Sequence, residues 1–317
     1  MGMLVEGAWK TDGLPRNRDG RFVRSAATFR DRVTAGGSSG FPAEAGRYHL
    51  YVSWACPWAH RTAILRKLKG LEETISLSSV EPFMGEDGWS FSEDFPDHLH
   101  GAGFLREVYT KADPGYTGRV TTPVLWDREQ GTIVNNESRE IMKMLDTEFE
   151  GFATTDEGFY PEDLRDEIEV TLDALYEPVN NGVYRTGFAR TQPAYEEAVT
   201  ELFEALDRFE GVLSRRRYLC GASVTEADWA FFTTLVRFDP VYHGHFKCNL
   251  RRIVDYPNLW GYVRDLYQYP GVAETVDLGH IKEHYYSSHE SINPTRIVPK
   301  GPIVDFSTPH GREDMAG

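Results

Sequence analysis

The sequence predicts an α/β domain followed by an all-helical domain. Residues 47–146 carry β-α-β and then β-β-α signals in chain order, and residues 147–161, rich in Gly, Asp and Thr, read as a linker. After residue 161 strand signals nearly vanish and apolar residues recur at helix spacing. We therefore expect an arm over 1–46, the α/β domain over 47–146, the linker over 147–161, the helical domain over 162–292 and a tail over 293–317.

The composition is that of a globular protein. Of 317 residues, 40% are hydrophobic and 13% aromatic, which suffices for two packed cores. A net charge of −15 disfavours nucleic acid and anionic lipid as partners, so we expect a small molecule. The chain shows no apolar run of membrane-spanning length and no signal peptide, which predicts a cytoplasmic protein with no membrane partner. Three cysteines make no disulfide framework.

A cysteine stands at the joint between the first predicted strand, residues 48–52, and a helix. Pro57 suits the first helical position, so Cys56 becomes the N-cap. Unpaired N–H groups and the positive end of the helix dipole favour a thiolate there. The alternative is a buried, inert thiol, which we expect for Cys220 and Cys248 because they lack such a joint. Cys56 is therefore the candidate nucleophile.

The α/β domain continues with an amphipathic helix and a second strand. The helix covers residues 58–69 and ends at Gly70, and the strand covers 75–80. A long polar connection over 81–116 follows. It holds Trp89, which either anchors its own loop or contacts a ligand.

A β-hairpin and a helix start close this domain. Strands are predicted over 119–126 and 132–136, around a Gly-containing turn. Pro123 cannot donate a ladder hydrogen bond, so it belongs at the start of its strand, and its peptide bond is a candidate for cis. Glu137 and Ser138 then begin a helix, where they either cap it or bind a ligand's ammonium or carboxylate.

The remaining segments are predicted more coarsely. The arm is expected to pack on the first domain, and the tail is either an ordered wrap or disordered. Thr225 and Asp228 form a capping-box pattern. His243, His245 and Cys248 offer metal-ligand types, but no second cluster completes a zinc-like site, so no metal is expected. The helices of the second domain are expected over 162–176, 195–215, 226–238, 257–267 and 278–286.

These segments together carry a family resemblance. The first domain resembles the thioredoxin-like arrangement, with Cys56 at the position of the active thiol and Pro123 at that of the cis-proline. With the helical half, the chain resembles the glutathione transferase superfamily and, within it, the Xi class of glutathionyl-hydroquinone reductases. The segments that carry the Xi likeness are 54–61, 180–184, 237–239, 244–249 and 284–289.

The resemblance implies a role for each matching residue. Cys56 is the nucleophile, and glutathione lies across Trp89, the chain before Pro123, and the helix start at Glu137 and Ser138. Three tyrosines would ordinarily be assigned to the core, but the motifs around them match the family's site tyrosines. By this resemblance, Tyr184 exchanges a proton with the quinone ring, while Tyr242 and Tyr285 bind the substrate's hydroxyls or the thiolate. The backbone expected to pair with the peptide belongs to Arg119, Val120, Thr121 and Thr122.

The implied reaction forms a mixed disulfide on Cys56 that a second glutathione resolves. Ala59 stands where a dithiol oxidoreductase would hold its resolving cysteine, so an external thiol is required. That thiol is glutathione or a related peptide such as γ-glutamylcysteine, and the family implies a homodimer. Two rivals stay open: an Omega-type thiol transferase or dehydroascorbate reductase, and a non-enzymatic binding relative.

Overall fold

The computed structural model describes residues 2–12 and 19–315, which form two compact units. Unit 1 comprises Met1–Arg16, Ser25–Glu157 and Gly279–Ser288, and unit 2 comprises Asn17–Arg24, Gly158–Leu278 and His289–Gly317. Unit 1 contains the strands, and every regular element in the described part of unit 2 is a helix. The predicted succession of an α/β domain and an all-helical domain is confirmed.

Unit 1 is built on a four-stranded sheet in the order β4-β3-β5-β6. Strand β4 runs parallel to β3, whereas β5 is antiparallel to both of its neighbours, β3 and β6. This order and these directions confirm the predicted thioredoxin-like arrangement. The strands are β3 (Tyr48–Val52), β4 (Ile75–Ser79), β5 (Val124–Asp127) and β6 (Thr132–Asn135).

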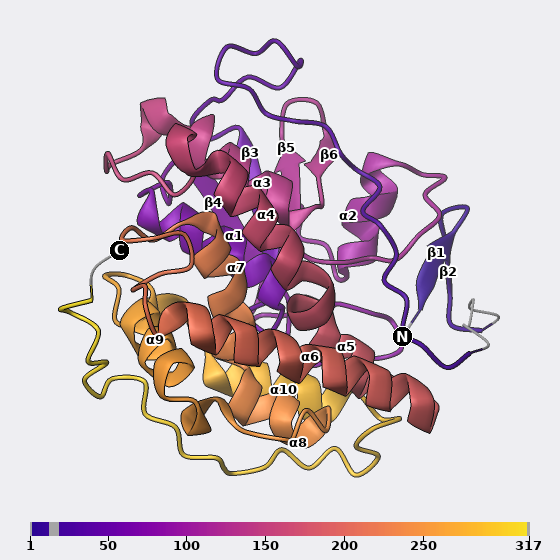
Figure 1. Cartoon of the computed structure of the whole chain (residues 1–317). Coiled ribbons are helices and arrows are strands. Elements are labelled where there is room, and N and C mark those ends of the chain that lie inside the picture. Colours follow the sequence, from indigo (N-terminus) through magenta and orange to yellow (C-terminus); the bar gives the residue numbers. More distant parts are fainter. Residues whose placement is uncertain (1, 13–18, 316–317) are drawn as a thin grey trace. The chain divides into compact units, whose positions relative to one another are not determined.

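Two helices of this unit, α1 (Pro57–Leu68) and α3 (Ser138–Thr147), pack against each other (Figure 1). Their ends are joined by a buried ion pair, since Lys69 Nζ lies 3.2 Å from Asp146 Oδ1. Helix α1 stops at Gly70, which has φ +63°, and a Cβ there would meet Thr154 Oγ1 at 1.8 Å. The predicted glycine stop therefore has both a conformational and a steric reason.

The connection over 81–116 is not wholly irregular. It contains α2 (Leu105–Ala112), which contacts β6 and buries Leu105, Val108 and Tyr109. At eight residues α2 is too short for its apolar spacing to stand out in the sequence. The arm also holds a short hairpin, β1 (Met3–Val5) and β2 (Ala8–Lys10), which the sequence analysis did not predict.

The arm packs on unit 1 over most of its length. Leu4 exchanges two backbone hydrogen bonds with Gly118, and Trp9 Nε1 donates to Glu86 O. Farther along, Val33 is fully buried. The exception is the short stretch that ends at Arg24, which belongs to unit 2, where Arg21 pairs with Glu197.

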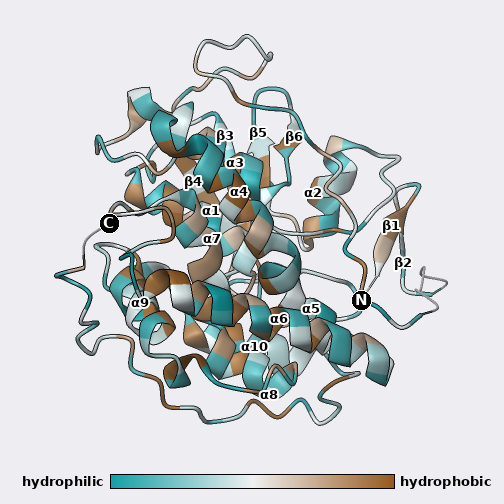
Figure 2. Cartoon of the chain, in the orientation of Figure 1, coloured by the Kyte–Doolittle hydropathy of each residue, from teal (hydrophilic) through white to brown (hydrophobic). Residues whose placement is uncertain are grey.

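The helices of unit 2 are amphipathic where they are long. Figure 2 shows hydrophilic and hydrophobic residues interleaved along α6, whose Leu202, Phe203, Leu206 and Phe209 are buried. The predicted capping box is confirmed at the start of α7, where Thr225 and Asp228 bond each other's backbone. The helices are α4 (Arg165–Leu175), α5 (Gly182–Gly187), α6 (Gln192–Leu213), α7 (Glu226–Leu235), α8 (His243–His245) and α9 (Pro257–Tyr267).

The tail is an ordered wrap on unit 2, one of the two predicted alternatives. Phe306 is buried, with its ring 5.2 Å from that of Tyr267. Arg312 is also buried and donates to three main-chain carbonyls, including that of Leu213 at 3.0 Å. Among the described residues, no helix combines the length and apolarity needed to cross a bilayer.

The last helix, α10 (Leu278–Ser288), lies mostly in unit 1, although it follows the helical segment in the sequence. His284 Nδ1 lies 2.8 Å from Pro82 O, and Ser288 Oγ accepts from Met84 N at 2.9 Å. These long-range bonds tie α10 to the connection after β4, so it joins the α/β unit rather than the helices that precede it.

Candidate functional site

Cys56 stands at the N-cap of α1, directly beyond the C-terminal end of β3. Its backbone is extended, with φ −76° and ψ 117°, and Pro57 occupies the first helical position as predicted. The first turn of α1 holds no acidic side chain, so the positive end of the helix dipole is not neutralised locally. Cys56 is half-buried, and its Sγ lies 3.5 Å from Thr122 O. The sulfur therefore faces the backbone that precedes Pro123.

The other two cysteines are placed differently. Cys220 and Cys248 are buried, and burial raises the pKa of the Cys220 thiol to about 11. Burial raises the pKa of Cys248 as well. Both sulfurs stay protonated at neutral pH, which fits the predicted structural role and leaves Cys56 as the accessible thiol.

The chain before Pro123 provides one wall of the site. The Thr122–Pro123 peptide is cis, as predicted. Thr122 is 4% exposed, and its Oγ1 has no hydrogen-bond partner among the described residues. Thr122 thus offers a carbonyl oxygen beside the sulfur and a buried, unsatisfied hydroxyl, which are groups a bound peptide could use.

The residues just before Thr122 face elsewhere. Both backbone groups of Thr121 bond to the Tyr109 hydroxyl, and the carbonyl of Arg119 accepts from the Tyr116 hydroxyl at 3.1 Å. Val120 is buried in the core of unit 1. The structure therefore places Thr122 against Cys56, whereas the Arg119 carbonyl and both backbone groups of Thr121 bond to tyrosines of the connection over 81–116.

Glu137 and Ser138 form the start of α3. Glu137 is the N-cap, and its Oε1 accepts from Arg139 N at 3.3 Å and from Ser138 Oγ at 3.5 Å. Asn135 Oδ1 in turn accepts from Glu137 N at 2.7 Å. The helix-capping interpretation is thus confirmed, and the long bonds of the carboxylate leave lone pairs for a ligand cation.

Trp89 and Tyr285 lie in the same unit as Cys56. Trp89 is 8% exposed and belongs to a hydrophobic cluster, so it anchors its own loop. Its ring stacks on that of His284, the neighbour of Tyr285 on α10. Tyr285 is 1% exposed. Through His284, the structure brings two sequence-predicted site residues together within unit 1.

Tyr184 and Tyr242 belong to unit 2, where their ring centroids are 6.1 Å apart. Phe246 lies against both, 5.6 Å from each. Tyr184 on α5 is half-buried, whereas Tyr242 is fully buried at the end of the π-helix η4 (Phe238–Tyr242). A second π-helix, η3 (Tyr176–Asn180), precedes α5. Such helices are frequent at functional sites, and the two here position both tyrosines.

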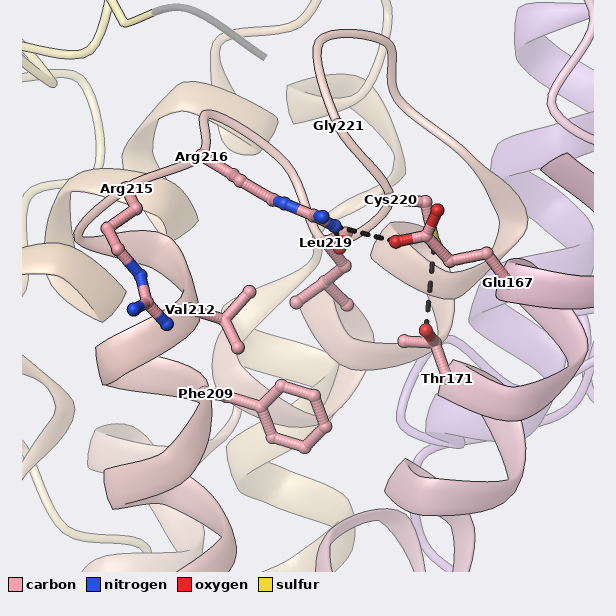
Figure 3. Close-up of a pocket in the computed structure, with 9 residues that line it drawn as sticks. All are labelled: Glu167, Thr171, Phe209, Val212, Arg215, Arg216, Leu219, Cys220 and Gly221. Carbon is pink, nitrogen blue, oxygen red and sulfur yellow. Dashed lines mark hydrogen bonds and ion pairs between the residues drawn. The ribbon is translucent and has the colours of Figure 1, made fainter.

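Unit 2 also contains a cavity of about 730 Å³ that none of the predicted site residues lines (Figure 3). Arg216 spans it to pair with Glu167 at 2.6 Å, and Cys220 Sγ lies 3.7 Å from Thr171 Oγ1. Its one thiol is thus the buried Cys220 described above. The lining residues are Glu167, Thr171, Phe209, Val212, Arg215, Arg216, Leu219, Cys220 and Gly221.

Metal-ligand side chains do not gather anywhere in the part of the chain that the structure describes. Nowhere in residues 2–12 and 19–315 do three or more His, Cys, Asp or Glu side chains gather as they would around a metal ion. His245 instead forms a hydrogen-bonded pair with His289, with 3.1 Å between Nε2 and Nδ1. Burial lowers the pKa of His245 to about 4, so this ring is uncharged at neutral pH.

Sequence reasoning missed three residues that organise the site. Tyr109 and Asn136 bond to each other beside the predicted cradle, and His284 stacks on Trp89. Asn136 directly precedes the predicted site residue Glu137, and His284 begins the segment 284–289 that carries the Xi resemblance. The sequence therefore held a signal for both residues. Tyr109 gave no signal because its partner Thr121 is twelve residues away, beyond any helical or strand period.

Comparison with known proteins places the chain among transferases. The sequence model of the glutathione S-transferase N-terminal domain matches residues 55–148, and that of the glutathione S-transferase C-terminal domain matches residues 192–265. The arm, α10 and the tail lie outside both matches.

Individual relatives match over nearly the whole length. The chain is 51% identical to glutathionyl-hydroquinone reductase YqjG of Escherichia coli over 100% of both proteins. It is 52% identical to glutathionyl-hydroquinone reductase PcpF of Sphingobium chlorophenolicum, covering 95% of this chain and 96% of PcpF.

Solved structures agree with these relatives. A Xi class glutathione transferase from Natrialba magadii, 54% identical, superposes with a TM-score of 0.95 over 100% of this chain and 98% of its own. The glutathione-bound structure of YqjG, 49% identical, superposes with a TM-score of 0.91 over 99% of both chains.

Proposed function

Because the chain belongs to the glutathione S-transferase family and to its Xi class, we propose that it reduces glutathionyl-hydroquinones to hydroquinones with glutathione as the reductant. The observation that carries this proposal is the 51% identity to a glutathionyl-hydroquinone reductase along the entire chain. A cysteine at a helix start can supply the thiolate nucleophile that such a reaction needs.

Glutathione binds along unit 1 in this proposal. Glu137 takes the γ-glutamyl ammonium, and Ser138, with the N–H groups at the start of α3, takes the γ-glutamyl carboxylate. The backbone around Thr122 pairs with the peptide in the manner of an added strand. This places the thiol of glutathione at Cys56, since Thr122 O lies 3.5 Å from Cys56 Sγ.

The reaction proceeds in two balanced halves. Tyr184 gives a proton to the ring carbon that bears sulfur while a ring hydroxyl loses one, which produces a keto form with a weaker carbon-sulfur bond. The Cys56 thiolate attacks that sulfur, the carbon-sulfur pair returns to the ring, and the hydroquinone leaves. A second glutathione thiolate then attacks the mixed disulfide, which releases oxidised glutathione and the Cys56 thiolate. Over both halves, the glutathionyl sulfur of the substrate and one free glutathione thiol are joined as oxidised glutathione, while the ring carbon exchanges its sulfur for hydrogen and the ring oxygen regains its proton.

Tyr242 and Tyr285 serve the substrate hydroxyls or the thiolate. Both are almost fully buried, so each presents a hydroxyl from a rigid setting rather than from a mobile loop. Trp89 shapes the peptide side of the site. These roles of Tyr242, Tyr285 and Trp89 rest on the resemblance of the surrounding sequence to the family. Single substitutions at each position can test them.

The decisive experiment is mass spectrometry after one turnover. We expect a glutathione-sized adduct on Cys56 when the protein meets a glutathionyl-hydroquinone, and no adduct on Cys56→Ser. Steady-state assays then separate the Omega-type rival: turnover of dehydroascorbate without turnover of the glutathionyl-hydroquinone would overturn the proposal. A protein that turns over neither and forms no adduct would be the non-enzymatic relative.

The identity of the thiol needs its own comparison. Glutathione and γ-glutamylcysteine share the γ-glutamyl group that Glu137 and Ser138 would hold, and they differ only in the glycine. We expect glutathione to give the higher kcat/KM. A preference for γ-glutamylcysteine would assign that peptide as the physiological reductant and leave the chemistry of Cys56 unchanged.

The proposal also includes a cytoplasmic homodimer. The family supports the dimer, and the sparse cysteines suit a reducing compartment in which Cys56 stays available. Light scattering checks the assembly, since a monomer has a mass of 36.1 kDa and a homodimer twice that.

A further inference from the structure

The hydroxyl of Tyr109 links two stretches of unit 1 that lie far apart in the sequence. It donates to Thr121 O at 2.9 Å, and it accepts from Thr121 N at 3.3 Å and from Asn136 Nδ2 at 3.2 Å. A phenol has one proton to donate and two lone pairs to accept with. These three bonds match the hydrogen-bonding capacity of the group, and the Thr121 hydroxyl lies a little farther away, at 3.4 Å.

Each partner stands one residue before a group that would hold glutathione. Thr121 precedes Thr122, whose carbonyl faces Cys56, and Asn136 precedes Glu137, the N-cap of α3. The peptide plane between Thr121 and Thr122 is rigid, so a fixed Thr121 carbonyl also fixes the Thr122 N–H. One buried hydroxyl thus spans the two places where the ends of the peptide would bind.

Phe29 of the N-terminal arm contacts both Asn136 and Tyr109. Phe29 exchanges two bonds with Asn136, from Phe29 N to Asn136 Oδ1 and from Asn136 N to Phe29 O, both at 3.1 Å. The ring of Phe29 lies 5.9 Å from that of Tyr109 and 5.5 Å from that of Tyr116. Tyr116 in turn donates to Arg119 O. The arm lies outside the region that the N-terminal family model matches, so this bracing is additional to the domain's shared core.

The chemistry of Tyr109 suits a permanent link. Its side chain is fully buried, and this burial raises the pKa of the phenol to about 12. The proton therefore stays on the oxygen at neutral pH, and the bond to Thr121 O persists.

We propose that Tyr109 is a positioning residue for the thiol peptide: its hydroxyl sets the spacing between the backbone at Thr122 and the start of α3. The inference rests on the proposed function, because it assumes that glutathione spans these two points. Tyr109 touches neither the sulfur nor the reacting ring. It acts on the affinity for the peptide and leaves the chemistry of Cys56 to the groups around the thiol.

The test measures glutathione binding by calorimetry in a Cys56→Ser background, which prevents turnover. Tyr109→Phe keeps the ring and removes the hydroxyl, and we expect the Kd for glutathione to rise by about tenfold, the factor for a net loss of roughly 1.4 kcal/mol of hydrogen bonding. In the Cys56 protein, the KM for glutathione should rise while kcat changes by less than about twofold, since no transition-state contact is lost.

A matched control is Tyr48→Phe, which removes a buried hydroxyl of the same unit that donates to Pro42 O, away from Thr121 and Asn136. Its Kd should stay unchanged. Asn136→Asp is the second variant: it keeps the acceptor for Phe29 N and removes the donor to Tyr109, so it decides the matter if Tyr109→Phe does not fold.

The outcomes separate the two proposals. If the Cys56→Ser protein binds glutathione and neither Tyr109→Phe nor Asn136→Asp weakens that binding, the positioning role is wrong and the proposed function stands. If the Cys56→Ser protein with Tyr109 intact binds no glutathione, the proposed function fails and the positioning role fails with it.

Discussion

The indole ring of Trp89 stacks on the imidazole of His284, with ring centroids 4.8 Å apart and 23° between the ring planes. His284 Nδ1 donates to Pro82 O at 2.8 Å, because a carbonyl oxygen can only accept. Both contacts hold α10, and with it Tyr285, against the loop that carries Trp89. A residue from near the C-terminal end of the chain thereby supports the same unit as Cys56.

Replacing His284 by Asn keeps a possible donor to Pro82 O and removes the ring stack. Stacked ring pairs contribute about 0.5–1.5 kcal/mol beyond the area they bury, so kcat/KM for the glutathionyl-hydroquinone should fall by roughly threefold to tenfold. His284→Phe, which keeps a ring, should lose less. Steady-state kinetics of the two variants check this order, and equal losses would show that the stack is immaterial.

Replacing Tyr184 by Phe should separate the two halves of the reaction. Proton transfer by a positioned side chain contributes about 10²-fold or more, so turnover of the glutathionyl-hydroquinone should drop by that factor. Formation of the Cys56 mixed disulfide from oxidised glutathione needs no ring protonation and should be unaffected. Tyr195→Phe, which removes the hydroxyl of a half-buried tyrosine that donates to Lys247 O, is the control. Parallel losses in both assays would assign Tyr184 a structural role.

Replacing Ala59 by Cys should introduce an internal resolving thiol. Ala59 is buried in the first turn of α1, three residues after Cys56, the spacing of a dithiol motif. After exposure to oxidised glutathione, mass spectrometry should find less glutathione adduct and an internal disulfide. Ala63→Cys is the control, because seven helical residues separate it from Cys56 by about 10 Å, beyond the reach of a disulfide. An adduct as abundant in Ala59→Cys as in the parent protein would contradict the prediction.

The stability of unit 1 should fall in mild acid because of His49. Its ring is fully buried between the hydroxyls of Ser76 and Ser78, and burial, helped by the Arg128 cation, lowers its pKa from 6.5 to about 3. Between these two values the unfolded chain binds the extra proton, so stability is full above pH 6.5 and is lost as the pH falls toward 3.

The free energy of unfolding should drop through this window by at most about 1.4 kcal/mol per pH unit from His49 alone. Urea titrations at several pH values measure this slope. His49→Gln carries no titrating ring. Its free energy of unfolding should therefore change less with pH than that of the parent protein between pH 6.5 and 4.5, a range that lies between the two pKa values. Curves of equal slope for the two proteins would contradict the prediction.

Much of the fold was predictable because its signals are local. The strand at 48–52, the helix after Pro57, the glycine stop at Gly70 and the capping box at Thr225 each depend on residues within a few positions. Helix α2 was missed because eight residues show too little helical periodicity, and the β1–β2 hairpin was missed because each of its strands has only three residues.

The candidate site divides in the same way. Cys56, Glu137 and Ser138 stand at helix starts, which turn chemistry marks in the sequence. The tie from Tyr109 to Thr121 and Asn136, and that from His284 to Pro82 and Trp89, join segments with no common period, so nothing in the local pattern announces them.

By itself, the sequence determined the kind of site: a thiol at a helix N-cap, a proline opposite it, an acid and a hydroxyl at the next helix start, and no second cysteine at Ala59. Only the tertiary structure decided which groups hold that site in place. It drew α10 into the α/β unit and turned both backbone groups of Thr121 toward Tyr109. The physical reason is that local propensity acts over a few residues, whereas buried polar groups must find partners wherever the fold brings them together.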